Sequence, residues 1–197
     1  SDVDYQKMTY DAQAFKSLPM GFVLRGYGKL GYGNDLPFYK NFYAGGYGSV
    51  RGYDNSSLGP KYPSVIFQET GKNDPAREKV GGNALIQFGT ELALPLPFKG
   101  DWARQVRPVL FAEGAQVFDT KCDVPSGNIL VNSSNVDIKQ YCKDNYNFNF
   151  DNMRYSVGVG FTWITMIGPL SLSYAFPLND KKGDDTKSIQ FEIGRTF

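Results

Sequence analysis

The residue of this sequence with the clearest capacity for chemistry is Arg51, which lies in a glycine-rich segment, GGYGSVRGY, at residues 45–53. Glycine permits positive φ and close approach of the backbone, and a guanidinium keeps its charge at any ordinary pH. The combination predicts an arginine carried on a tight turn into an enclosed space, where a buried charge needs a carboxylate beside it. The alternative is a solvated arginine on a surface turn, where most arginines lie.

Catalytic chemistry is strongly limited, because the sequence contains no histidine. This absence excludes Ser-His-Asp and Cys-His catalysis and most transition-metal sites. Gly26-x-Gly28-x-x-Gly31 formally matches the dinucleotide-binding fingerprint, but a turn sequence follows at residues 32–37 where that motif requires a helix. We therefore expect a protein that is not an enzyme and that has no metal and no cofactor.

The two cysteines, Cys122 and Cys142, bracket a polar segment rich in Asn, Asp and Ser. A cysteine pair in such a loop is most simply a disulfide in an oxidising compartment. The lack of a third and fourth ligand argues against a zinc site. We predict a disulfide between them.

Length and composition favour one domain that is not an ordinary helical protein. The 197 residues include 22 glycines, 15 phenylalanines and 13 tyrosines. The formal net charge of +1 gives no electrostatic case for nucleic-acid binding. No run approaches the roughly 18 apolar residues of a spanning helix. A mean hydropathy of −0.38 is still compatible with a membrane β-barrel, whose strands alternate apolar and polar residues.

Seven segments show the period-two alternation that is typical of β-strands. The plainest is 154–163, where aromatic and β-branched residues alternate with small or polar ones. Glu91 and Glu113 lie on the polar side of their segments, which we expect to face inward. The predicted strands are residues 7–14, 24–32, 82–95, 107–115, 154–163, 170–176 and 189–197.

The connections between these segments alternate in length. Short turns at 16–21, 97–102 and 166–168 alternate with long connections at 34–80, 119–152 and 179–187. Outer-membrane barrels have this asymmetry, with short periplasmic turns and long extracellular loops. A soluble sandwich would have shorter strands and no systematic asymmetry. The predicted fold is therefore all-β, an antiparallel transmembrane β-barrel integral to the bacterial outer membrane.

Seven strands are an odd number, whereas single-chain bacterial barrels close with an even number. We expect either the C-terminal part of a larger barrel or an eighth strand near residues 64–68. An isolated partial barrel exposes sheet edges, so we expect it to self-associate through them or to aggregate.

Three segments closely resemble the sixth extracellular loop of the BamA family, the core of the machinery that assembles outer-membrane β-barrels: Phe42-Tyr43-Ala44-Gly45-Gly46, Val50-Arg51-Gly52-Tyr53 and Gly59-Pro60. The resemblance continues through residues 81–84, 168–170, 173–175 and 191–197, so it spans almost the whole chain. It implies that residues 1–197 are a C-terminal portion of a sixteen-stranded barrel, without the POTRA domains. The loop 34–80 would fold into the lumen, and 119–152 would form a cysteine-containing extracellular loop.

The resemblance also implies roles for individual residues. Arg51 would lie inside the barrel against acidic residues of two strands, which by position are Glu91 and Glu113. The last strand resembles the β-signal by which the machinery recognises its substrates, although a lipid-facing last strand demands the same alternation. The residues concerned are Phe191, Ile193, Gly194 and Phe197.

The function implied is insertion and folding of β-barrel proteins into the outer membrane, without catalytic chemistry. The implied partners are the lipid bilayer, unfolded outer-membrane proteins and accessory lipoproteins of the assembly machinery. TamA-like and two-partner-secretion translocators share the Arg-Gly turn and are the nearest alternatives. A passive outer-membrane pore is the alternative from another class, distinguished by a steady open conductance.

Overall fold

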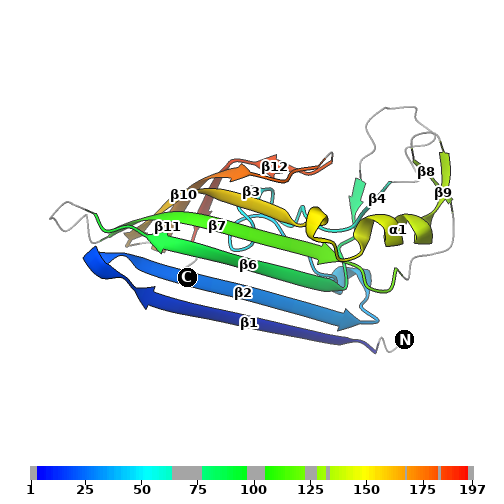
Figure 1. Ribbon diagram of the computed structural model, residues 1–197, viewed down its shortest axis with the longest axis horizontal. Helices are drawn as coiled ribbons and strands as arrows, with labels where there is room; N and C mark the ends of the chain where they lie inside the picture. Colours follow the sequence, from blue (N-terminus) through cyan, green and yellow to red (C-terminus); the bar gives the residue numbers. More distant parts are fainter. Residues whose placement is uncertain are drawn as a thin grey trace.

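Seven long strands form one antiparallel sheet in the computed structural model of the protein (Figure 1). The structure describes residues 4–63, 77–96, 105–122, 128–131, 134–166, 168–181 and 183–194. Each strand pairs with the next long strand along the chain. In spatial order the strands are β1 (Gln6–Ser17), β2 (Val23–Asn34), β6 (Ala84–Ala93), β7 (Val106–Phe118), β10 (Arg154–Thr165), β11 (Gly168–Pro177) and β13 (Ile189–Ile193).

The predicted fold class is confirmed, because these strands are the seven that alternation predicted. Among the described residues the sheet does not close, and β1 and β13 are its two edges. The strand predicted near residues 64–68 lies outside the described residues. No helix in the described part of the chain is both long and apolar enough to cross a membrane.

The two faces of the sheet differ in polarity, as the alternation requires. Along β10 the outward side chains of Val157, Val159, Phe161 and Trp163 are exposed, whereas Ser156 on the inner face is buried. This outward face is the one expected to contact lipid, because apolar side chains that no protein covers are stable there.

The described parts of the long connections lie at one end of the sheet, and the described turn between β1 and β2 lies at the other (Figure 1). Both the long connections and the first short turn contain short elements that the sequence did not predict. These are η1 (Pro19–Gly21), η2 (Phe38–Lys40), β3 (Gly52–Tyr53), β4 (Lys61–Pro63), β5 (Arg77–Lys79), β8 (Asn128–Val131), β9 (Ser134–Asp137), α1 (Ile138–Tyr146), η5 (Phe150–Asn152) and β12 (Thr186–Lys187).

The last strand, predicted over residues 189–197, spans Ile189–Ile193 among the described residues, and Gly194 leaves the extended conformation with a φ of +89°. Residues 195–197, which include the predicted terminal Phe197, lie outside the described residues. Towards the long-connection end, β12 pairs with β3 of the long loop.

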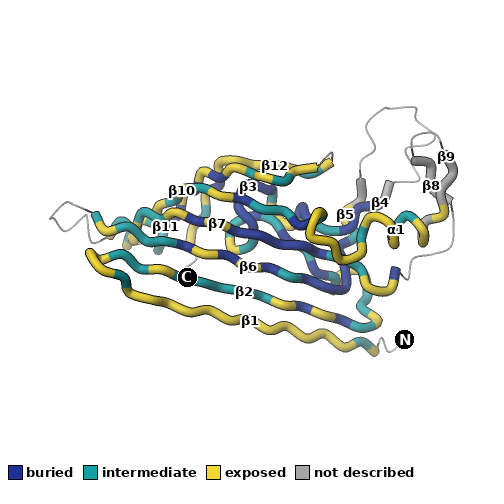
Figure 2. Tube along the Cα trace, in the orientation of Figure 1, coloured by how far each residue is buried: buried dark blue, intermediate teal, exposed yellow. Residues whose placement is uncertain are grey.

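The buried core lies between the first long connection and the sheet. Figure 2 shows the buried segments gathered in this connection and in the adjoining parts of β6 and β7, whereas β1 is exposed along its length. The loop therefore packs against the inner face of the sheet at β6 and β7. The core residues are Phe42, Ala44, Val50, Tyr53, Leu58, Leu85, Ala115 and Val117.

Placing a charge on the outward face should destabilise the protein in a bilayer. Val159 lies midway along β10 and is exposed. Val159→Arg is expected to lower the free energy of unfolding in lipid by about 2–4 kcal/mol, the typical cost of an arginine near the bilayer midplane. Val159→Ala is the control for lost methyl groups. Equal stability of the two variants in a denaturant titration in lipid vesicles would contradict the outward assignment.

Candidate functional site

The glycine-rich segment forms a tight turn that depends on its glycines. Gly45, Gly46, Gly48 and Gly52 have φ of +102°, +89°, +82° and +95°, a region that favours glycine. A Cβ atom at Gly52 would lie 3.3 Å from the Cβ of Ala175 on β11. The turn therefore needs glycine both for its conformation and for its close approach to the sheet.

The turn brings Arg51 onto the inner wall, where Glu113 of β7 is its main partner. Nε and Nη2 of Arg51 donate to Oε1 of Glu113 at 2.9 and 2.5 Å, and the backbone N–H of Arg51 donates to Oε2 at 2.7 Å. One carboxylate thus binds both the side chain and the backbone of the arginine. Such charge-assisted bonds fix the position of the turn as well as its charge.

Glu91 of β6 is shared between two arginines. Its Oε1 accepts a hydrogen bond from Nη2 of Arg51 at 2.5 Å, and its Oε2 accepts one from Nη1 of Arg25 at 2.9 Å. Arg25 lies directly opposite Glu91 in the register of β2 and β6. Two arginines and the carboxylates of Glu91 and Glu113 therefore form a charge-balanced cluster on the inner wall.

Three of the four members of the cluster are almost fully removed from solvent, and Arg25 is partly exposed. Arg51 is 1% exposed, Glu113 4% and Glu91 7%. Burial by itself would lower the pKa of Arg51, but the carboxylates of Glu113 and Glu91 outweigh that effect and raise this pKa above its ordinary value. The arginine is therefore charged at every physiological pH, and its partners compensate the cost of burying that charge.

Tyr27 of β2 also binds Glu113, although β6 lies between their strands. Its hydroxyl donates to Oε1 of Glu113 at 2.5 Å. Gly89 of β6 is the intervening residue, opposite both Tyr27 and Glu113 in the two registers. A Cβ atom there would lie 2.5 Å from Cζ and Oη of Tyr27. A glycine at this position lets the tyrosine cross the strand.

An aromatic ring supports the guanidinium from the wall. Cζ of Arg51 lies 3.5 Å from the ring centroid of Phe111 on β7 and 5.3 Å from that of Tyr47. The Phe111 ring lies against Gly158 of β10, where a Cβ atom would be 2.5 Å from the ring. Cation–π contact of this kind stabilises a desolvated arginine without adding charge.

Comparison with known proteins agrees with this geometry. The family model described as the Omp85 superfamily domain matches residues 1–197. The chain belongs to the Omp85 superfamily. It is therefore part of an integral β-barrel of the bacterial outer membrane, and the predicted location is confirmed.

Two relatives of this Omp85 domain are named as outer membrane protein assembly factors. The chain is 35% identical to "Outer membrane protein assembly factor BamA" of Neisseria meningitidis serogroup B, covering 100% of this chain and 24% of that protein. It is 25% identical to the protein of the same name from Nitratidesulfovibrio vulgaris, covering 98% of this chain and 20% of that protein. The chain thus spans about a quarter or less of each. Neither name denotes an enzyme, in agreement with the prediction of a non-enzymatic protein.

A solved structure has the same architecture. The crystal structure of BamA from Haemophilus ducreyi lacking POTRA domains 1–3 matches with a TM-score of 0.75 at 30% sequence identity. The match covers 96% of this chain and 35% of that chain. The open sheet described here is therefore a partial barrel, as predicted.

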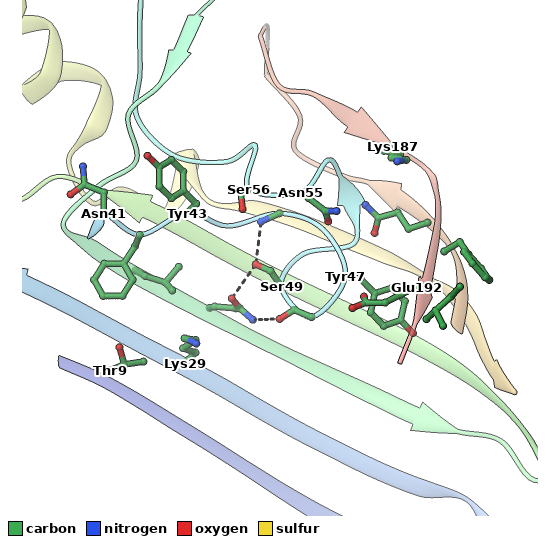
Figure 3. A pocket seen from close by; sticks show the side chains of 18 of the residues that line it. Thr9, Lys29, Asn41, Tyr43, Tyr47, Ser49, Asn55, Ser56, Lys187 and Glu192 are labelled. Carbon is green, nitrogen blue, oxygen red and sulfur yellow. Dashed lines mark hydrogen bonds between the residues drawn. The ribbon is translucent and has the colours of Figure 1, made fainter. Parts of the chain in front are cut away.

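A second set of contacts holds the glycine-rich turn of residues 45–53 against β6. Ser49 Oγ donates to Oε1 of Gln87 at 3.0 Å, Nε2 of Gln87 donates to the carbonyl oxygen of Gly48 at 3.1 Å, and the N–H of Gly45 donates to Ser49 Oγ at 3.1 Å (Figure 3). This clamp lies beside a polar cavity of about 790 Å³ between the loop and the inner faces of β1, β2 and β13. The lining includes Lys29 and Lys187, together with Glu192.

The described residues contain no cluster of three His, Cys, Asp or Glu side chains that could hold a metal ion. The hydrogen bonds of Arg51 and Ser49 to the wall hold the loop against β6 and β7. The sequence identified Arg51, Glu91 and Glu113 for this site, and the structure brings them together. Tyr27 and Gln87 were missed, although both have the inward parity of their strands.

Cys122 and Cys142 form the predicted disulfide, which ties the start of the second long connection to helix α1. Both cysteines are buried. At the end of this helix the hydroxyl of Tyr146 donates to the carbonyl oxygen of Lys61, and its own carbonyl oxygen accepts from the N–H of Asp119 at 2.9 Å. The disulfide therefore fixes a helix that contacts the first long connection.

Removing the hydroxyl of Tyr27 should loosen the loop. Tyr27→Phe keeps the ring but removes the hydrogen bond that the hydroxyl donates to the charged Glu113. We expect the free energy of unfolding to fall by about 1.5–3 kcal/mol. We expect a lower melting temperature and faster amide hydrogen exchange at residues 49–53. Tyr10→Phe, on the exposed face of β1, is the matched control and should change neither. Unchanged exchange in Tyr27→Phe would show that this hydrogen bond does not hold the turn.

Removing the disulfide should free the second long connection and leave the sheet intact. A closed loop of 20 residues contributes about 3 kcal/mol through chain entropy. The double variant Cys122→Ser and Cys142→Ser should show rapid proteolysis within residues 119–152, with an unchanged β-sheet circular dichroism spectrum. Wild-type protein with reductant is the control and should behave alike. Equal protease resistance of the double variant, the reduced wild type and the untreated wild type would contradict this role.

Proposed function

We propose that this Omp85 domain takes part in inserting and folding β-barrel proteins into the outer membrane, without catalytic chemistry. The similarity to proteins named as outer membrane protein assembly factors, over the full length of this chain, supports this proposal. The observation that carries it is the buried pairing of Arg51 with Glu113 and Glu91, because this pairing holds the loop against the inner wall, whereas a passive pore needs an open water-filled lumen.

The proposed mechanism is strand addition at an open sheet edge. In lipid a backbone N–H or C=O group has no water to bond, so an unpaired strand gains strongly from an edge that offers partners. Strand β13, the last strand of the partial barrel, has β11 as its neighbour on one side only in the described sheet. Arg51 would hold the loop 34–80 in the lumen, in the conformation required for assembly, and the loop 119–152 would lie on the extracellular side.

The proposed partners follow from the same mechanism. They are the lipid bilayer, unfolded outer-membrane proteins and accessory lipoproteins, with self-association through open edges when the domain is isolated. A strand resembling the β-signal would end the chain, carried by Phe191, Ile193, Gly194 and Phe197. Phe191 and Ile193 are exposed, which fits both a recognition signal and a lipid-facing strand.

Reversing the charge of the loop arginine tests the function. Arg51→Glu puts a third carboxylate against Glu113 and Glu91, and breaking a buried pair typically costs about 3–5 kcal/mol. In a full-length protein we expect Arg51→Glu to abolish growth of cells that lack another copy and to deplete folded outer-membrane proteins. Adding Glu113→Arg should restore both in part. Glu91→Arg is a poorer partner, because it would place a second arginine beside Arg25.

Lys139→Glu is the matched control, since this charge reversal lies on an exposed position of α1. It should leave growth and the level of folded outer-membrane proteins unchanged. Normal growth of cells carrying Arg51→Glu would remove the arginine from the mechanism. Equal failure of the single and double variants, with both folded, would reject the charge pairing.

A further inference from the structure

The first long connection folds back on itself before it enters β6. The N–H groups of Val80 and Gly81 both donate to the carbonyl oxygen of Pro60, at 3.0 and 3.2 Å. The same two segments pair further along in strands β4 and β5. We call Pro60, Lys61, Val80 and Gly81 the neck of the loop, because the chain passes through them on its way out from the glycine-rich turn and on its return to the sheet.

Helix α1 of the second long connection packs against both segments of the neck. The buried disulfide lies against Val80, Tyr141 and Tyr146. The hydroxyl of Tyr146 also donates to the carbonyl oxygen of Lys61. One helix therefore contacts the outgoing segment at Lys61 and the returning segment at Val80.

The position of α1 depends on the disulfide. The helix has nine residues, and an isolated helix of fewer than about 12 residues is marginal in water. Its buried contacts centre on Cys142, which is covalently joined to Cys122 at the start of the connection. The disulfide closes a loop of 20 residues and so removes much of the conformational freedom that the helix would otherwise have. Tyr146 therefore reaches Lys61 because the disulfide keeps the helix in place.

The third long connection contacts the same neck through less rigid groups. The ammonium of Lys61 donates to the carbonyl oxygen of Gly183 at 2.7 Å. Next to the neck, Lys79 pairs with Asp185 at 3.0 Å, but their side chains are 40% and 51% exposed. An exposed ion pair contributes little, because water screens it and two flexible side chains must be ordered. We therefore expect the helix, which a covalent bond holds, to be the main attachment at the neck.

We propose that helix α1 is a brace that keeps the neck of the loop closed, and that the Cys122–Cys142 disulfide holds this brace in position. The brace acts on the backbone of the neck and shares no residue with the arginine cluster. When the disulfide is absent, the neck opens while Arg51 stays paired with Glu113. A loop that is attached at two places remains near the wall when either attachment opens, because the other keeps its effective concentration high. The brace does not depend on the proposed function.

Amide hydrogen exchange at individual residues tests the brace, because it measures local opening. The N–H groups of Val80 and Gly81 report on the neck, and the N–H of Arg51, which bonds to the wall, reports on the arginine cluster. The variant is Cys122→Ser with Cys142→Ser, in the full-length protein in lipid vesicles. We expect exchange at Val80 and Gly81 to rise tenfold or more and exchange at Arg51 to change less than about twofold.

A second variant tests the contact between helix and neck with the disulfide in place. Tyr146→Phe keeps the ring and removes the hydroxyl that bonds to Lys61. It should also raise exchange at Val80 and Gly81, by less than the double serine variant. Tyr141→Phe is the matched control on the same helix, because its ring packs on the disulfide and its hydroxyl has no hydrogen-bond partner among the described residues. It should leave exchange at the neck unchanged.

Unchanged exchange at Val80 and Gly81 in the double serine variant would overturn the brace, even if proteolysis within residues 119–152 increases. An equal rise at Val80, Gly81 and Arg51 would overturn its independence of the arginine cluster. If the double serine variant does not fold, the two phenylalanine variants decide: a rise at the neck in Tyr146→Phe alone supports the brace, and equal exchange in both overturns it.

Discussion

A charged arginine buried against the wall of a sheet is the constraint on which the rest of this structure depends. Arg51 is held in place by Glu113 and Glu91, and none of the three could be stable there alone. Reaching the wall requires the positive φ values of the glycine turn. Glycines in the wall make room for the rings around the cluster. The chemistry of one side chain thus accounts for small residues on three different elements.

The loop that carries this arginine also supplies the core. Buried apolar residues of the domain lie between the loop and the inner wall, because the apolar side chains on the outward face are expected to contact lipid. A barrel strand turns half of its side chains towards lipid. The inward side chains are buried only where another segment of the protein covers them, and elsewhere they contact water. Here Val50 and Tyr53, on either side of the arginine, pack into that core. The position of the charge and the packing of the loop therefore depend on each other.

Much of the fold and part of the site follow from a period of two. Alternation places Glu91 and Glu113 on the inward face of adjacent strands without any knowledge of register, and the family resemblance was needed to pair them with Arg51. Tyr27 could not be found in this way, because its contact with Glu113 depends on the register across Gly89. The pairing of Tyr53 with Thr186 joins positions far apart in sequence, and two-residue strands have no readable period. Asp137 does cap α1, but one capping residue within a polar segment is a weak signal.

Two sets of contacts hold the motif around Arg51, and they differ in chemistry. The arginine cluster consists of buried charges, so losing one partner leaves another charge uncompensated. Strands β3 and β12 are joined by backbone hydrogen bonds, and the side chain of Gln190 on β13 adds a bond to the carbonyl oxygen of Tyr53. Gly52 lies between the two sets, with a φ of +95° in the region that favours glycine. The turn at Gly52 therefore lets one short motif bind the acidic residues of β6 and β7 and the segment before β13 together.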